Sequence, residues 1–122
     1  MRRPENVLWL LDQVKSPWIK NVYDYSHYKV QGLDMRETMK QVVPGAVFIH
    51  VKDGVGTALN HRFLLPGDSR EIDYKEYVKI FGELRYTGPV VVEVSVHVFD
   101  EPGYDGIAAA KRCWENLGSI IV

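Results

Sequence analysis

An acidic residue lies inside an apolar run near the C-terminus of the chain. Glu93 interrupts the valine-rich stretch 89–95, which follows a glycine and is typical of a strand buried on both faces, as in a parallel sheet. A buried carboxylate costs on the order of several kcal/mol unless a metal ion or a cationic side chain meets it. Glu93 therefore predicts either a metal ligand or an internal ion pair with lysine or arginine.

Two other strand-like runs also end in side chains that can bind a metal. The first ends at Asp24, with His27 three residues later, and the second ends at His50. Because the carboxyl ends of parallel strands meet at one edge of a sheet, we expect Asp24, His50 and Glu93 to converge on one pocket. This donor set suits a divalent ion such as Mn²⁺, Zn²⁺, Co²⁺, Fe²⁺ or Mg²⁺. The lack of thiolate ligands argues against a closed structural zinc site.

Each of these side chains also has a structural interpretation. Asp24 at a strand end could be a capping or turn residue, and His27, among several tyrosines, could be a packed aromatic ring. For His50 a functional role is favoured, because the polar residues Lys52 and Asp53 follow it directly. The sequence leaves both interpretations open for each residue taken alone.

Helical and strand-like segments alternate along the chain. The periodicity of apolar residues predicts helices over 4–14, 35–43, 74–85 and 107–117, and strands over 18–24, 45–50 and 89–95. Asp34 and Asp73 are expected to cap the second and third helices, and Gly118 to stop the last. Residues 53–70 are expected to form a long functional loop. The order is α-βα-βα-βα, which predicts an α/β fold with three parallel strands in a single domain over residues 1–122.

Size and charge narrow the class of protein. The 122 residues suffice for one core but are about half of the roughly 250 that a closed eight-stranded α/β barrel needs. A formal net charge of -1 gives no reason to expect nucleic acid or an anionic membrane as partner. Cys113 is the single cysteine, so there is no disulfide framework. Since no apolar run approaches the roughly 18 residues of a membrane span, we expect a soluble, cytoplasmic protein.

The order and spacing of several motifs resemble a known family. They match the C-terminal half of the sugar phosphate isomerase/epimerase superfamily of xylose isomerase-like TIM barrels, over nearly the whole chain. The motifs are Asp24-Tyr-Ser-His27, His50-Val-Lys-Asp53, Leu65-Pro-Gly67, Glu71-Ile-Asp-Tyr74, Tyr86-Thr-Gly88 and Val91-Val-Glu-Val94. The resemblance implies a partial (β/α) TIM-barrel-like unit.

The resemblance also implies a metal-dependent reaction. Asp24, His50 and Glu93 match three of the four metal ligands of the family. Its members bind a sugar or polyol, in some cases phosphorylated, across a divalent ion and move a proton next to a carbonyl group. The residue that matches Glu93 is both a metal ligand and the catalytic base. This implies an isomerase or epimerase.

Further residues match positions that contact substrate in the family. His27 matches a histidine that touches the substrate, which makes it a second candidate catalytic residue. Arg62 is similar in position to an arginine that holds hydroxyl or phosphate oxygens. We also expect Lys52 to contact the substrate.

The chain departs from the family in two ways, and both leave alternatives open. The fourth ligand, a glutamate on an earlier strand, has no counterpart, because Glu5 and Asp12 lie in a helical pattern. Three strands also cannot close a barrel, so their edges would be left open. We therefore expect a homo-oligomer or a missing N-terminal half, and the isolated chain could be a non-catalytic, self-associating truncated barrel. A lesser alternative is a metal phosphodiesterase like endonuclease IV, which needs an aspartate where Asn60 precedes His61.

Overall fold

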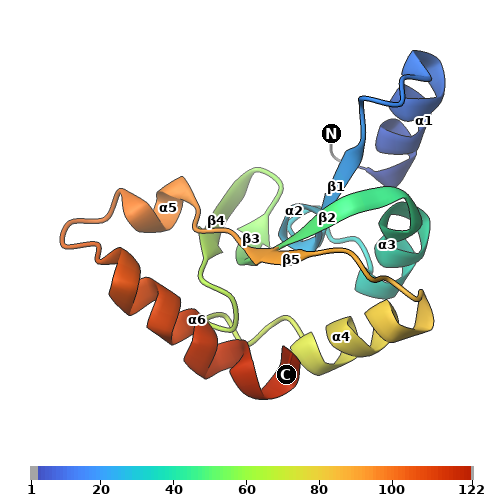
Figure 1. Cartoon of the computed structure of the whole chain (residues 1–122). Coiled ribbons are helices and arrows are strands. Elements are labelled where there is room, and N and C mark those ends of the chain that lie inside the picture. The colour runs from blue at the N-terminus through green and yellow to red at the C-terminus, as the bar shows by residue number, and fades with distance from the viewer. Residues whose placement is uncertain (1–2, 122) are drawn as a thin grey trace.

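The computed structural model describes residues 3–121, in which helices and a small parallel sheet alternate (Figure 1). In chain order the elements are α1 (Pro4–Val14), β1 (Asn21–Asp24), α2 (Tyr25–Lys29), α3 (Met35–Val42), η1 (Val43–Gly45), β2 (Ala46–Val51), β3 (Asp53–Thr57), β4 (Asn60–Leu64), α4 (Tyr74–Glu83), β5 (Val90–Val92), α5 (Val96–Phe99) and α6 (Gly106–Ile121).

The central sheet has three parallel strands in the order β1-β2-β5. Asp24 is paired with His50, and His50 with Val91, so the ends of the strands are aligned. The three parallel strands predicted from the sequence are thus confirmed. Strands β1 and β5 flank β2, and both pair with it at His50. The carboxyl ends of all three strands therefore lie side by side.

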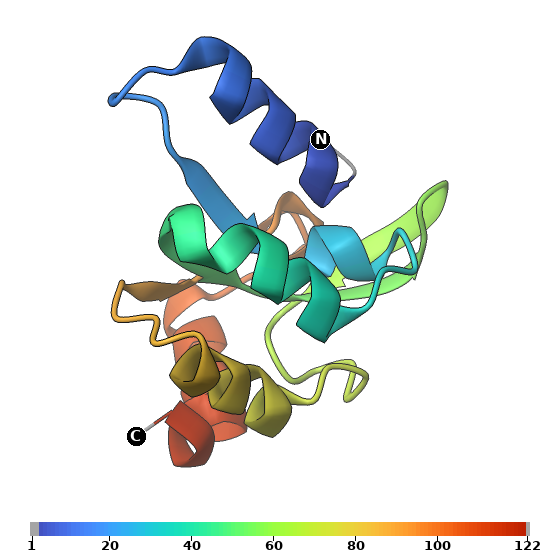
Figure 2. The same cartoon turned by 90° about the vertical axis from the view of Figure 1, so that its right-hand side faces the viewer.

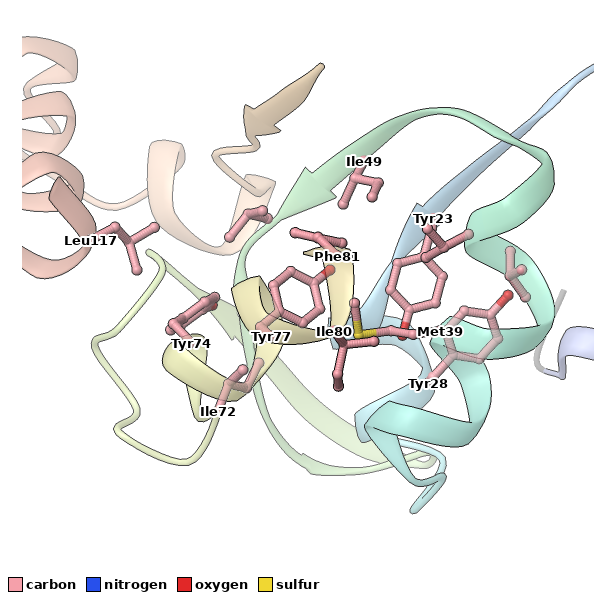
Figure 3. Close-up of a cluster of buried hydrophobic side chains, with 13 residues drawn as sticks. Tyr23, Tyr28, Met39, Ile49, Ile72, Tyr74, Tyr77, Ile80, Phe81 and Leu117 are labelled. Carbon is pink, nitrogen blue, oxygen red and sulfur yellow. The ribbon is translucent and has the colours of Figure 1, made fainter. Parts of the chain in front are cut away.

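The main core lies between the sheet and helices α3 and α4 (Figure 3). Tyr23 from β1 and Ile49 from β2 are fully buried there, with Met39 from α3 and Ile80 from α4. The ring of Tyr23 stacks on Tyr28 at 5.5 Å between centroids, and its hydroxyl lies 2.8 Å from the Thr38 hydroxyl. This packing of aromatic rings fixes the outer face of β1 and β2 against the helices.

Aspartates begin the two helices that cover the sheet, as the sequence predicted. The Asp34 carboxylate accepts a hydrogen bond from the Glu37 amide of α3, and the Asp73 carboxylate accepts from the first amides of α4. Such caps satisfy amides that have no partner within the helix.

The expectation of a long loop over residues 53–70 is wrong for its first two thirds. Strands β3 and β4 form an antiparallel hairpin there, and only the part after Leu64 is irregular. Gly56 near the turn has a φ of +89°, and a Cβ atom there would lie 2.2 Å from the Asn60 carbonyl oxygen. Gly54 lets the hairpin approach the Ser26 carbonyl oxygen. The sequence signal for these strands was weak, because β3 contains two glycines and β4 begins with three polar residues.

The expected burial of residues 89–95 on both faces is also wrong. Strand β5 covers only Val90–Val92, and these valines are 46%, 44% and 41% exposed. Within residues 3–121 no strand pairs with the free edge of β5, so its side chains lack neighbours on that side. The first strand is shorter than expected too, since β1 begins at Asn21 and Trp18 is 91% exposed.

The C-terminal ends of three helices differ from those predicted from the sequence. Helix α6 continues through Gly118, whose missing side chain leaves room for the Trp114 ring: an added Cβ would lie 3.0 Å from that ring. Helix α3 gives way to η1 at Val43, and α4 ends at Glu83, two residues before Arg85 takes a left-handed φ of 53°. The short helices α2 and α5 were not expected.

Helices α1 and α6 lie at opposite ends of the molecule, on either side of the sheet (Figures 1 and 2). Within residues 3–121 the parallel sheet has two edge strands, β1 and β5, and does not close into a ring. None of the helices between residues 3 and 121 has the length and apolarity needed to cross a membrane.

Candidate metal centre

Asp24, His50 and Glu93 meet at the carboxyl ends of the three parallel strands. Each offers one ligand atom, and these atoms all lie within 4.8 Å of one another. Asp24 and His50 are the last and next-to-last residues of β1 and β2. Glu93 follows β5, and its amide donates to the Val51 carbonyl oxygen at 3.1 Å, which holds it against the end of β2. The structure brings together the three residues that the sequence predicted as ligands.

The Asp24 carboxylate is divided between two roles. Its Oδ1 accepts hydrogen bonds from the Ser26 amide at 2.9 Å and the Ser26 hydroxyl at 2.6 Å, and so caps α2. Its Oδ2 is buried and accepts no hydrogen bond from the part of the chain that the structure describes. The Lys52 ammonium lies 3.1 Å from this oxygen, outside hydrogen-bonding geometry. One oxygen thus confirms the capping interpretation, and the other forms an ion pair with Lys52 but accepts no hydrogen bond from the described residues.

The Glu93 carboxylate contacts a cation and an imidazole. Its Oε1 accepts a hydrogen bond from Lys52 Nζ at 2.7 Å, and its Oε2 lies 2.8 Å from His50 Nδ1. Partial burial acts to raise the pKa of Glu93, but the hydrogen bond and charge of Lys52, with His50 and His27, outweigh it and the pKa is lowered. Glu93 is therefore an ionised base at neutral pH. The two interpretations of Glu93 are both met: it forms an ion pair with Lys52, and it lies among the three candidate metal ligands.

The Lys52 side chain is only 3% exposed and lies between the two carboxylates. Its Nζ is 4.6 Å from the centre of the Phe63 ring, a cation-π contact. Sequence reasoning missed Phe63, because it lies in the segment expected to be a loop. The only signal at this position was an apolar pair, Phe63-Leu64, after three polar residues.

His27 borders the group from α2 and is half exposed. Its Nε2 lies 3.5 Å from Asp24 Oδ2, and its ring meets the Phe63 ring edge at 4.7 Å between centroids. Burial lowers the pKa of His27, and the negative charge of Asp24 offsets this only in part. A neutral imidazole at neutral pH can therefore accept or donate a proton at the border of the site.

Arg62 lies on β4 and points toward α5. Its guanidinium pairs with the Glu101 carboxylate and lies 3.4 Å from the His97 carbonyl oxygen. The His97 ring accepts a hydrogen bond from the Phe63 amide at 3.0 Å, so α5 is tied to the hairpin. The structure gives Arg62 no contact with Asp24, His50 or Glu93 among the ion pairs of the described residues. Its role in substrate binding stays a prediction.

A third carboxylate, that of Asp53 next to Lys52 in sequence, holds the surrounding loops. Asp53 is fully buried, and its oxygens accept hydrogen bonds from the Tyr74 hydroxyl at 2.5 Å and from the Ser69 amide and hydroxyl at 2.8 and 2.6 Å. These bonds join the hairpin to the start of α4. They fix the backbone from which Lys52 enters the site.

The chemistry of the three donor groups fits a divalent ion. Two carboxylates and one imidazole are ligands for Zn²⁺, Mn²⁺, Fe²⁺ or Co²⁺, whereas Mg²⁺ favours oxygen ligands alone. The buried Asp24 Oδ2 without a hydrogen-bond donor is an atom that a cation would satisfy.

Comparison with known proteins agrees with this arrangement of strands and site. A family model described as xylose isomerase-like TIM barrel matches residues 1–117. The chain belongs to this family. Its resemblance to xylose isomerase-like barrels, noticed from the sequence motifs, is confirmed, and its fold is a partial TIM-barrel-like α/β unit. No curated protein matches the chain.

A solved structure shows the same fold in a longer protein. The xylose isomerase domain protein from Planctomyces limnophilus superposes with a TM-score of 0.74 at 17% sequence identity, over 96% of this chain. The chain spans 43% of the length of that protein. The likeness shows that these elements are arranged as in a part of a xylose isomerase-like barrel.

Proposed function

We propose that this chain supplies part of the site of a divalent-metal-dependent sugar or sugar phosphate isomerase or epimerase. The observation that carries the proposal is the meeting of Asp24, His50 and Glu93 within 4.8 Å at the strand ends. It supports the proposal because the chain belongs to the xylose isomerase-like family, whose barrel places ligands at this end of the sheet.

Asp24, His50 and Glu93 would hold the ion. The chemistry supplied by such an ion is polarisation of hydroxyl and carbonyl oxygens, which acidifies the hydrogen on the neighbouring carbon. The identity of the metal within the set Mn, Zn, Co, Fe and Mg is left to titration.

The side chains around the ligands have the properties that proton transfer needs. Glu93, which is ionised at neutral pH, would accept the proton from the carbon next to the carbonyl and return it. His27, at the open border of the group, holds a sugar hydroxyl and exchanges its proton. The Lys52 ammonium stabilises oxygen that gains negative charge. Arg62 would contact a hydroxyl or phosphate group of the substrate after its ion pair with Glu101 is broken.

The proposed function requires that further strands or a second chain cover the open surfaces of this fold. The free edges of β1 and β5, and exposed apolar residues such as Trp9 and Trp114 on the flanking helices, support association with further strands. We propose that a second copy or an additional barrel segment covers them. Light scattering would show a concentration-dependent dimer in the first case and a monomer in the second. A cytoplasmic location belongs to the proposal, and the single, buried Cys113 thiol is compatible with a reducing compartment.

Calorimetric titration of the metal-stripped chain with Mn²⁺ and Zn²⁺ tests the metal centre. We expect one ion per chain, and we expect Glu93→Gln to weaken binding at least tenfold, about 1.4 kcal/mol. Glu101→Gln is the matched control, because that carboxylate pairs with Arg62 outside the ligand group. Equal affinity of the chain and the Glu93→Gln variant would refute the proposed site.

The reaction itself is tested by isotope exchange. The metal-loaded chain is incubated in D₂O with a set of ketoses and ketose phosphates, and exchange next to the carbonyl is followed by proton NMR. Exchange that is lost in Glu93→Gln supports isomerase or epimerase chemistry. Metal binding without exchange would favour the alternative of a non-catalytic truncated barrel.

A further inference from the structure

Lys52 is placed where it neutralises the carboxylates of the ligand group. Its ammonium donates to Glu93 Oε1 at 2.7 Å and lies 3.1 Å from Asp24 Oδ2. These are oxygens from two of the three groups that would hold a metal. The side chain is almost completely buried and comes from the residue after β2, so it has little freedom to move into water.

We propose that Lys52 is a built-in competitor of the metal ion: its ammonium holds Asp24 and Glu93 in their ligand positions without metal and is displaced from them when a divalent cation binds. The inference rests on the proposed metal site and assigns to Lys52 a role that precedes substrate binding.

Charge balance supports a competition. Two carboxylates and one ammonium leave the group with a net single negative charge, which is a moderate cost in a partly buried place. Without Lys52, the buried Asp24 carboxylate and the partly buried Glu93 carboxylate would face each other with no ammonium between them, and like charges that close repel strongly. A divalent ion bound to the same oxygens would in turn repel an ammonium that stays beside them. The two cations therefore cannot both keep their closest contacts.

The structure also offers Lys52 a place to go. Its Nζ already lies over the face of the Phe63 ring, 4.6 Å from the ring centre, and this face attracts a cation. A small rotation toward Phe63 would separate the ammonium from Asp24 and Glu93 without exposing it to water. In that position the ammonium would lie beside the ligand group, where it could contact an anionic oxygen of a bound substrate.

Lys52 therefore has opposite effects on two quantities: the stability of the metal-free chain and its affinity for a metal ion. Lys52 keeps the metal-free site folded, and it lowers metal affinity because binding must first break its contacts. Removing the ammonium should therefore destabilise the metal-free chain and tighten metal binding, which is opposite to what removal of a ligand does.

The test is calorimetric titration with Mn²⁺ of the unchanged chain and Lys52→Met, with thermal unfolding of the metal-free proteins. We expect Lys52→Met to bind Mn²⁺ at least tenfold more tightly, about 1.4 kcal/mol, and to unfold at a lower temperature without metal. Lys52→Arg keeps the charge and should keep the weaker affinity. If Lys52→Met does not fold, Lys52→Gln makes the same comparison.

Lys29→Met is the matched control. Lys29 is also a partly buried lysine, but it contacts Glu71 and the Gly54 carbonyl oxygen, away from the ligand group. Its removal changes the net charge equally and should leave the affinity unchanged. Affinity of Lys52→Met equal to or below that of the unchanged chain would overturn the role of Lys52 and leave the metal site standing. Absence of Mn²⁺ binding by every variant would overturn the metal site and this inference together.

Discussion

The two faces of the parallel sheet are built for different purposes. On the outer face, Tyr23 and Ile49 are fully buried under α3 and α4. On the inner face, Val22 precedes Asp24 and Val91 precedes Glu93 with the two-residue period of a strand, and both valines are more than a third exposed. The outer face holds the fold together, whereas the inner face presents the candidate site.

The difference shows how a partial barrel can remain folded. Helices supplied by the same chain cover the outer face of β1 and β2, so a core forms there within residues 3–121, whereas Val90 and Val92 of β5 on the same face stay 46% and 41% exposed. The inner face of a closed barrel is covered by the opposite strands, and residues 3–121 contain no strands in that position. Stability and function are therefore separable here, and substitutions on the two faces should have unequal effects.

The largest expected effect is a difference in the free energy of unfolding between substitutions on the two faces of the sheet. Ile49→Ala on the outer face should lower the free energy of unfolding by about 2–5 kcal/mol, because it leaves a cavity in a packed core. Val91→Ala on the inner face should cost less than about 1 kcal/mol, because much of that side chain already contacts water. Urea unfolding measures both. Equal losses would mean that the inner face is covered in solution, as a dimer would do.

A smaller effect is expected at Asp53, whose neighbour Lys52 contacts the inner-face carboxylates. Tyr74→Phe removes a hydrogen bond to the buried Asp53 carboxylate and should cost about 1–3 kcal/mol in urea unfolding. Tyr86→Phe is the control, because its hydroxyl bonds the Pro89 carbonyl oxygen at an exposed position. Metal affinity should remain in both variants. A selective tightening of metal binding in Tyr74→Phe would show that the Asp53 network holds Lys52 against the two carboxylates.

The smallest effect concerns ion pairs on the outer helices. Hydrogen bonds from Arg36 lower the pKa of Glu76 and Glu83 below the ordinary value of 4.5. Stability from these carboxylates is present above that value and is lost as the pH falls through the lowered pKa of the folded state. The melting temperature should therefore fall between pH 6 and pH 3, and it should fall less in Arg36→Met. An unchanged pH dependence in Arg36→Met would assign the acid sensitivity to other carboxylates.

Much of the candidate site followed from residue type and strand periodicity. Asp24, His50 and Glu93 each end or follow an apolar run, and parallel strands bring such ends together. Phe63 and the hairpin were missed, because β3 contains Gly54 and Gly56 and β4 begins with three polar residues, so neither shows the alternation by which a strand is recognised. The exposure of Val90–Val92 was missed because an apolar run alone does not tell whether both neighbouring strands are present.

The sequence by itself determined the alternation of helices and strands, the caps at Asp34 and Asp73, and the set of metal-competent side chains. These depend on local backbone preferences and on periods of about 3.6 and 2 residues, which a sequence contains directly. Only the tertiary structure decided that Lys52 lies between Asp24 and Glu93 and that Arg62 turns to Glu101. Those contacts join residues 28 to 41 positions apart, and which of several lysines, arginines and carboxylates pair is set by how the sheet, hairpin and α5 pack.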